Sequence, residues 1–128
     1  MKILNLVVHG VYYDLIQKGK KTKEYRAITE YYVKRFMIGG TEMSVEQREK
    51  LAEELKTPSK REETMKKWHT NIREDYTHVL FRRGAAPTTM LVKLKDIELF
   101  GNNFVLNLGE IEKNGDMYQR EVPATDGV

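Results

Sequence analysis

The chain has 128 residues, no cysteine and a net charge of +3 at neutral pH. This length is typical of one domain that buries its own core, and the lack of cysteine excludes disulfide bonds and thiolate chemistry. No apolar run reaches the ~18 residues that a membrane span needs, and the N-terminal segment makes a poor signal peptide. We therefore expect a soluble, cytoplasmic protein with no membrane partner and, by default, a monomer.

The positive charge is concentrated near the beginning of the chain. Residues 1–39 carry eight Lys/Arg and three Asp/Glu, whereas residues 40–75 carry eight against nine and residues 76–128 carry six against seven. A localised basic face attracts a phosphate backbone, whereas a merely solvated face more often has its signs interspersed. The charge distribution therefore indicates an anionic partner for the first segment.

The first third of the chain predicts two strands and two short helices. Residues 2–8 form an apolar run typical of a buried strand, and apolar side chains on one face predict a helix over residues 11–18. Gly19 follows where a helix needs a residue that tolerates a positive φ, so it marks the C-terminal cap. Residues 21–27 alternate like a strand, and a second helix, capped by a threonine, is expected over residues 30–37.

The middle of the chain predicts two further helices. Capping-box patterns begin at Ser44 and Ser59 and predict helices over about 44–56 and 60–74. Each helix offers one narrow apolar stripe, so the two are expected to form a charged hairpin. Because the strand pattern resumes only afterwards, we interpret residues 41–75 as a helical insertion.

The remainder of the chain predicts three strands, over residues 77–83, 88–99 and 104–110. Along the second of these strands, Leu91 is expected to face outward, because its neighbours on both sides face inward. Residues 112–128 are polar and are predicted to form a mobile tail. The total of about five strands and about four helices predicts an α+β fold.

The segment that begins at Gly19 gathers cations around one carboxylate. Gly19, Lys21, Glu24 and Arg26 stand at the spacing G-x-K-x-x-E-x-R. This pattern is similar to the signature of the ASCH domain family (activating-signal-cointegrator homology), a branch of the PUA-like β-barrels. The resemblance extends on both sides of the motif, over roughly residues 2–37 and 77–111.

The resemblance implies a small PUA-like mixed β-barrel of about five strands with peripheral helices. It also implies a single domain over residues 1–111 that carries the helical insertion, residues 41–75. The barrel would contain a cleft that the motif lines, and this cleft would suit RNA or a nucleotide-like ligand. No metal and no cofactor are expected, because His9, His69 and His78 are scattered along the chain.

In this hypothesis the motif supplies the cations that hold an anion. Lys21 and Lys23 provide point charges, and the guanidinium of Arg26 can hold two oxygens in a fork. Glu24 and Arg26 are expected on the same strand face. Glu24 would then orient the guanidinium of Arg26 rather than react.

Further candidates lie outside the charged motif positions. Arg82 or Arg83 could add a second cationic wall to the cleft. Tyr25 and Tyr12 are candidate surfaces for stacking bases, although both rings can equally be core or rim aromatics. Trp68 either anchors the helical hairpin to the barrel or stacks on a base beside the cleft.

An enzyme is the main alternative to a binding domain. Some ASCH-like proteins are amidohydrolases that remove acyl groups from modified cytidines, and others are ribonucleases. The chain resembles the amidohydrolases at Lys21 but has Glu24 where they have a threonine nucleophile. Glu24 could instead act as a general base on water while Lys21 steadies the oxyanion, and this pair could also support metal-independent RNA cleavage. A third hypothesis is a protein-interaction module that uses the helical hairpin.

Overall fold

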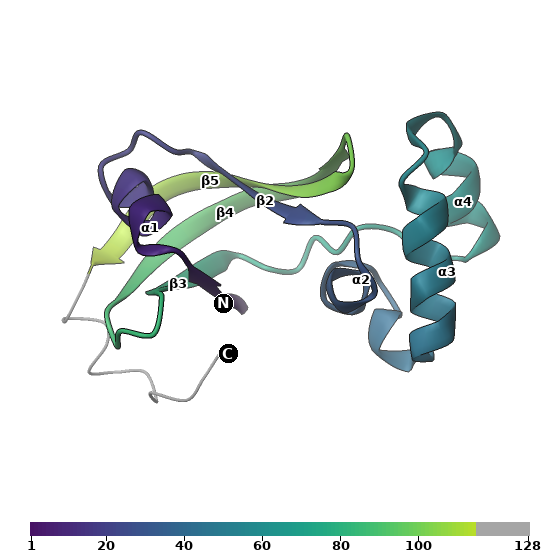
Figure 1. Ribbon diagram of the computed structural model, residues 1–128, viewed down its shortest axis with the longest axis horizontal. Helices are drawn as coiled ribbons and strands as arrows, with labels where there is room; N and C mark the ends of the chain where they lie inside the picture. Colours follow the sequence, from purple (N-terminus) through teal and green to yellow (C-terminus); the bar gives the residue numbers. More distant parts are fainter. Residues whose placement is uncertain (115–128) are drawn as a thin grey trace. The chain divides into compact units, whose positions relative to one another are not determined.

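The computed structural model describes residues 1–114 and has an α+β architecture, with a five-stranded sheet and four α-helices in this part of the chain (Figure 1). The predicted fold class is therefore confirmed, and a mixed sheet of this size is compatible with a small barrel-like fold. The PUA-like architecture itself stays a prediction. In chain order the elements are β1 (Ile3–Val8), α1 (Gly10–Gln17), β2 (Lys23–Ala27), α2 (Glu30–Phe36), α3 (Val45–Leu55), α4 (Arg61–Lys67), β3 (His78–Arg83), β4 (Thr89–Phe100) and β5 (Asn103–Asn114).

The sheet has the strand order β1-β3-β4-β5-β2. β1 pairs with β3 in parallel, with Ile3 opposite His78 and Val8 opposite Arg83, and β3 pairs with β4 in antiparallel fashion. The chain divides into two compact units, which are described separately below. The first unit contains residues 1–24, 75–96 and 107–114 of the described part, and the second contains residues 25–74 and 97–106.

The first unit is built on the pairing of β1 with β3. Leu4 and Leu6 of β1 are buried, and they stand in register with the buried Val79 and Phe81 of β3. This alternation is what a strand with one face on a core requires. The helix α1 ends where predicted, because Gly19 adopts a φ of +72° that few other residues tolerate.

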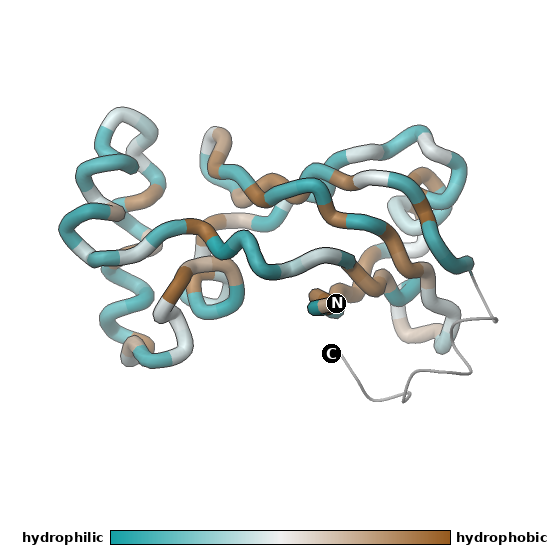
Figure 2. Tube along the Cα trace, turned by 180° about the vertical axis from the view of Figure 1, so that it is seen from behind, coloured by the Kyte–Doolittle hydropathy of each residue, from teal (hydrophilic) through white to brown (hydrophobic). Residues whose placement is uncertain are grey.

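The second unit is built around α2 and α3, which pack against each other. The hydroxyl of Thr29 accepts a hydrogen bond from the backbone N–H of Tyr32 and so caps α2 as predicted. Ser44 and Gln47 form the predicted capping box at the start of α3. Figure 2 shows α3 and α4 as mostly hydrophilic, whereas hydrophobic residues recur along the strands. None of the helices within residues 1–114 is long and apolar enough to cross a membrane.

The last predicted helix is shorter than expected. It was expected over 60–74, but α4 covers only Arg61–Lys67, and Ser59 lies in a short 3-10 turn instead of capping it. His69, two residues beyond α4, has a left-handed φ of +51°, which is incompatible with a continuing α-helix. Ile72 then forms an isolated β-bridge with Met37.

Two strand predictions also need correction. Leu91 does not face solvent: it is 1 % exposed and stands opposite Leu80, which is also buried, so this part of the sheet is covered on both faces. β5 continues to Asn114, three residues into the segment predicted to be a tail. The rest of that segment, 115–128, lies outside the described residues, and the predicted domain boundaries stay predictions.

We expect Gly40→Ala to destabilise the second unit. A Cβ at this position would lie 2.5 Å from the backbone oxygen of Val33 and 2.9 Å from the Cα of Lys34, and backbone atoms cannot move aside as a flexible side chain can. The expected loss is about 1–3 kcal/mol in the free energy of unfolding, measured by urea denaturation. Gly39→Asn is the matched control, because that site is open and asparagine tolerates its left-handed φ of +77°. Equal losses in the two variants would contradict the steric explanation.

Candidate nucleotide-binding site

The lysine of the motif is held between a carboxylate and an aromatic ring in the first unit. The backbone N–H of Lys21 donates to the carbonyl of Leu15, which fixes the residue at the end of α1. Its ammonium lies 3.4 Å from the carboxylate of Glu24 and 5.4 Å from the centre of the Tyr12 ring. We call Tyr12, Lys21 and Glu24 the Lys21 cluster.

The Lys21 cluster combines a sheltered ion pair with an open ring. The side chains of Lys21 and Glu24 are 19 % and 9 % exposed, whereas Tyr12 is 51 % exposed. An ammonium carries a full positive charge and three hydrogen-bond donors. The cluster can therefore offer an approaching ligand a fixed cation next to a flat aromatic surface.

Arg83 is also oriented by a carboxylate of the first unit. Its Nε and Nη2 donate to the two carboxylate oxygens of Asp14, at 3.2 and 3.1 Å. This bond lowers the pKa of Asp14 and, in turn, raises the pKa of Arg83. Gly10 gives the guanidinium its space, because a Cβ there would lie 2.8 Å from the Arg83 Cζ. The sequence contained no signal for these partners, since Asp14 and Arg83 are 69 residues apart.

The other predicted cations of the first unit have separate surroundings. The ammonium of Lys23 donates to the side-chain oxygen of Asn107 at 3.0 Å, and Asn107 in turn donates to Asp96 at 2.6 Å. Arg82 is half-buried in the sheet, opposite Thr89 of β4. The two arginines of β3 are neighbours in a strand, so their side chains point to opposite faces of the sheet. They cannot form one common wall.

A hollow of about 320 Å³ opens beside the glycine and lysine of the motif. It lies between the end of α1 and β5, and two lysines, Lys18 and Lys21, are among the residues that line it. Lys23, Arg82 and Arg83 are not among the residues that line it. The lining residues are Ile16, Gln17, Lys18, Gly19, Lys21, Thr22, Leu108, Gly109, Glu110 and Ile111.

Tyr25 and Arg26, the last two residues of the segment that carries the motif, belong to the second unit. Tyr25 is 49 % exposed. Arg26 donates from Nη1 to the hydroxyl of Tyr32 at 2.7 Å, and its guanidinium lies 5.7 Å from the centre of the same ring. The expected pairing of Glu24 with Arg26 stays a prediction.

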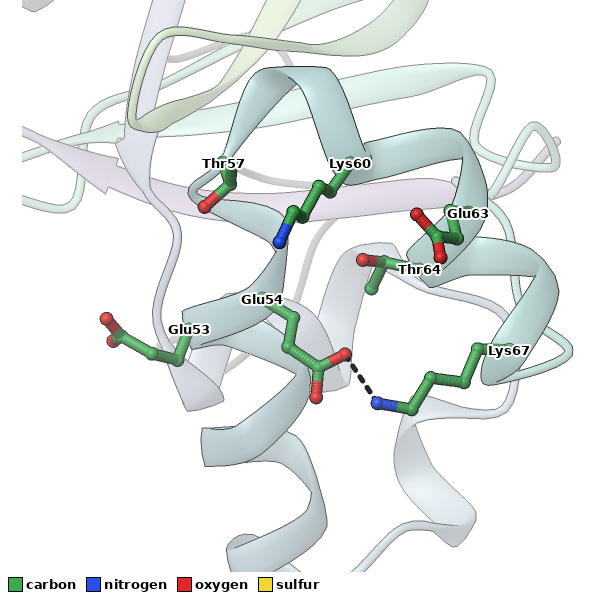
Figure 3. Close-up of a pocket in the computed structure, with 7 residues that line it drawn as sticks. All are labelled: Glu53, Glu54, Thr57, Lys60, Glu63, Thr64 and Lys67. Atoms are coloured by element: carbon green, nitrogen blue, oxygen red, sulfur yellow. Dashed lines mark hydrogen bonds and ion pairs between the residues drawn. The ribbon is translucent and has the colours of Figure 1, made fainter.

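A second hollow, of about 480 Å³, lies between α3 and α4 (Figure 3). Glu54 reaches across it and accepts hydrogen bonds from Lys67 at 3.0 Å and from the indole N–H of Trp68 at 3.2 Å. These hydrogen bonds connect Lys67 and Trp68 to α3. The stacking of Trp68 on a base stays a prediction. Trp68 and Met65 are both half-buried, and the protein-interaction module stays a hypothesis.

Two of the histidines belong to the first unit and contact different partners there. His9 contacts Tyr12 through a ring edge, and His78 is hydrogen-bonded to Glu112 at 3.0 Å. Within residues 1–114 no group of three or more His, Cys, Asp or Glu side chains could hold a metal ion.

Comparison of the chain with protein-family models, with curated proteins and with solved structures finds no match. The function must therefore be inferred from the chemistry of the chain's own residues.

The Asp14–Arg83 pair predicts a pH dependence of stability. Because the folded pKa of Asp14 lies below its ordinary value of 3.8, the pair stabilises the folded state fully above that pH. The contribution disappears as the pH falls through the lowered pKa. We expect the difference in unfolding free energy between the wild type and Asp14→Asn to shrink on acidification, as measured by urea denaturation over a pH series. In an Arg83→Gln background the Asp14→Asn substitution should lose this pH dependence, and a pH dependence that persists there would assign it to another partner.

Proposed function

We propose that this chain is an ASCH-like domain that binds RNA or a nucleotide-like ligand with the Lys21 cluster. The observation that carries the proposal is the position of the Lys21 ammonium, next to both a carboxylate and the open ring of Tyr12. Recognition of unpaired nucleotides uses cations for the phosphates and aromatic rings for the bases. The cluster offers both groups side by side.

The hollow next to the motif supports this proposal. Its volume of about 320 Å³ is at the lower end of the range in which proteins bind small ligands. Lys18 and Lys21 line it, while Glu24 pairs with Lys21 and Glu110, which also lines it, pairs with Lys93. A ligand with one or two phosphate groups would therefore meet ammonium groups there.

The distribution of charge supports an anionic ligand as well. The three carboxylates among residues 1–39 all pair with cations: Asp14 with Arg83, Glu24 with Lys21 and Glu30 with Arg48. The exposed lysines around the motif are therefore not neutralised by acids of their own segment. A nucleic-acid backbone would gain from this excess by releasing its counterions.

The proposal predicts salt-dependent binding of a labelled oligouridylate, measured by fluorescence anisotropy. We expect the affinity to fall steeply as the salt concentration rises, and Lys21→Met to weaken binding about tenfold and to reduce the salt slope by about 1. Lys21→Arg should preserve most of the affinity, since it keeps the charge.

Lys2→Met is the matched control for Lys21→Met. It also removes from the first unit one lysine that lies between a carboxylate, Asp75 at 3.1 Å, and a ring, Tyr76 at 5.7 Å, but Lys2 does not line the hollow. Circular dichroism would verify that each variant is folded. A flat salt response of the wild type, or equal losses in the two methionine variants, would contradict the proposal.

A hydrolase is the second candidate, and the sheltered Lys21–Glu24 pair favours it. A carboxylate with a side chain only 9 % exposed and an ammonium 3.4 Å away can act as general base and oxyanion stabiliser. The substrates to examine are N-acylated cytidine and RNA. If the pair is catalytic, Glu24→Gln should abolish turnover measured by chromatography of the products, because the amide cannot accept a proton from water. Activity that persists in Glu24→Gln would remove Glu24 from the mechanism.

A further inference from the structure

The second unit carries an exposed tyrosine that is paired with an arginine on α2. Tyr31 is 46 % exposed, and Arg35 lies four residues later, so the two side chains are neighbours on the helix surface. The Arg35 Nη1 donates to the Tyr31 hydroxyl at 3.3 Å, and the guanidinium carbon lies 5.6 Å from the ring centre. This contact holds a flat cation and a flat ring together at the surface.

Neighbouring rings fix the position of Tyr31. Its ring meets the ring of Tyr32 edge to face, with the centres 4.9 Å apart, and Tyr32 stacks on Phe36 at 5.3 Å. Phe36 is fully buried and contacts Phe104 edge to face at 5.2 Å. The exposed ring therefore belongs to an aromatic row that begins in the core, and it needs little ordering when a ligand binds.

Two further cations lie next to the Tyr31–Arg35 pair. Lys34 is exposed on α2, and the guanidinium of Arg73 donates to the carbonyl of Arg35 at 3.4 Å. The acid of α2, Glu30, is neutralised by Arg48, whose Nε donates to it at 2.7 Å. An anionic chain would thus find cations on this surface and no free carboxylate on α2.

We propose that the Tyr31–Arg35 pair is a stacking platform for a base of single-stranded RNA, with Lys34 contacting the adjacent phosphate. The inference rests on the proposed function and deepens it, because it names the class of nucleic acid and a contact surface on the second unit. A duplex does not fit, since its bases are stacked inside and cannot lie on a side-chain ring. Rings and guanidinium planes are the surfaces on which unpaired bases stack, and phosphates provide the complementary charge.

The experiment measures the affinity of the full chain for a labelled oligouridylate of about ten nucleotides, a length within the range that single-strand-binding sites cover. Tyr31→Leu keeps an apolar side chain but removes the ring, so we expect it to weaken binding about tenfold. Tyr31→Phe keeps the ring and loses only the hydroxyl, so its affinity should remain close to that of the wild type. Arg35→Lys keeps the charge but loses the flat guanidinium and should fall between the two. Urea denaturation verifies that all three variants are as stable as the wild type.

The outcome separates this inference from the proposed function. Tyr31→Leu with unchanged oligouridylate affinity would overturn the stacking platform, while a loss in Lys21→Met would leave the proposed function standing. If Tyr31→Leu weakens oligouridylate binding and Lys21→Met does not, the stacking platform stands and the Lys21 cluster is overturned as the binding site. Uridine monophosphate is the second probe: Tyr31→Leu should leave its affinity unchanged if this nucleotide binds at the Lys21 cluster. Wild-type protein that binds neither oligouridylate nor uridine monophosphate would overturn both, and binding of the monophosphate alone would overturn only the stacking platform.

Discussion

The parallel pairing of β1 with β3 is the constraint on which the core of the first unit and its Asp14–Arg83 pair depend. Parallel strands cannot be joined by a tight turn, so the chain must make a long excursion between them. Here residues 9–77 form that excursion, and the chain then returns so that Arg83 stands opposite Val8. The pairing brings the guanidinium of Arg83 to Asp14 and Gly10, at the beginning of α1. Without this register, Asp14, near the start of the chain, would lack its cationic partner from β3.

A second feature is that a neighbouring side chain contacts three of the predicted cations, two in the first unit and one in the second. Glu24 holds Lys21, Asp14 holds Arg83, and Tyr32 holds Arg26. Such contacts remove rotamer freedom before any ligand arrives, so less entropy is lost on binding. They also limit the attraction for anions, because a carboxylate partner competes with a phosphate for the same donors. Fixed but partly neutralised cations would favour a ligand that adds stacking contacts to its charge, and the first and second units each carry one half-exposed ring beside a cation, Tyr12 and Tyr31.

Local features were predictable from the sequence because their determinants lie within one helical turn. The cap at Gly19, the Thr29 cap of α2 and the capping box at Ser44 each depend on residues at most four positions away. The prediction for α4 was wrong because a helical pattern says little about where tertiary contacts interrupt it. His69 leaves the helical conformation, and Ile72 pairs with Met37 instead of extending the stripe.

By itself, the sequence determined the α+β class, most element positions and the concentration of cations in residues 1–39, since these follow from short-range periodicity and composition. The tertiary structure alone decided the partner of each cation and the division of the motif, with Lys21 and Glu24 in the first unit and Arg26 in the second. It also buried Leu91, because the face predicted to be open is covered. The physical reason is the same in each case: these outcomes depend on contacts between residues distant in sequence, and no local pattern encodes which distant side chain will be the neighbour.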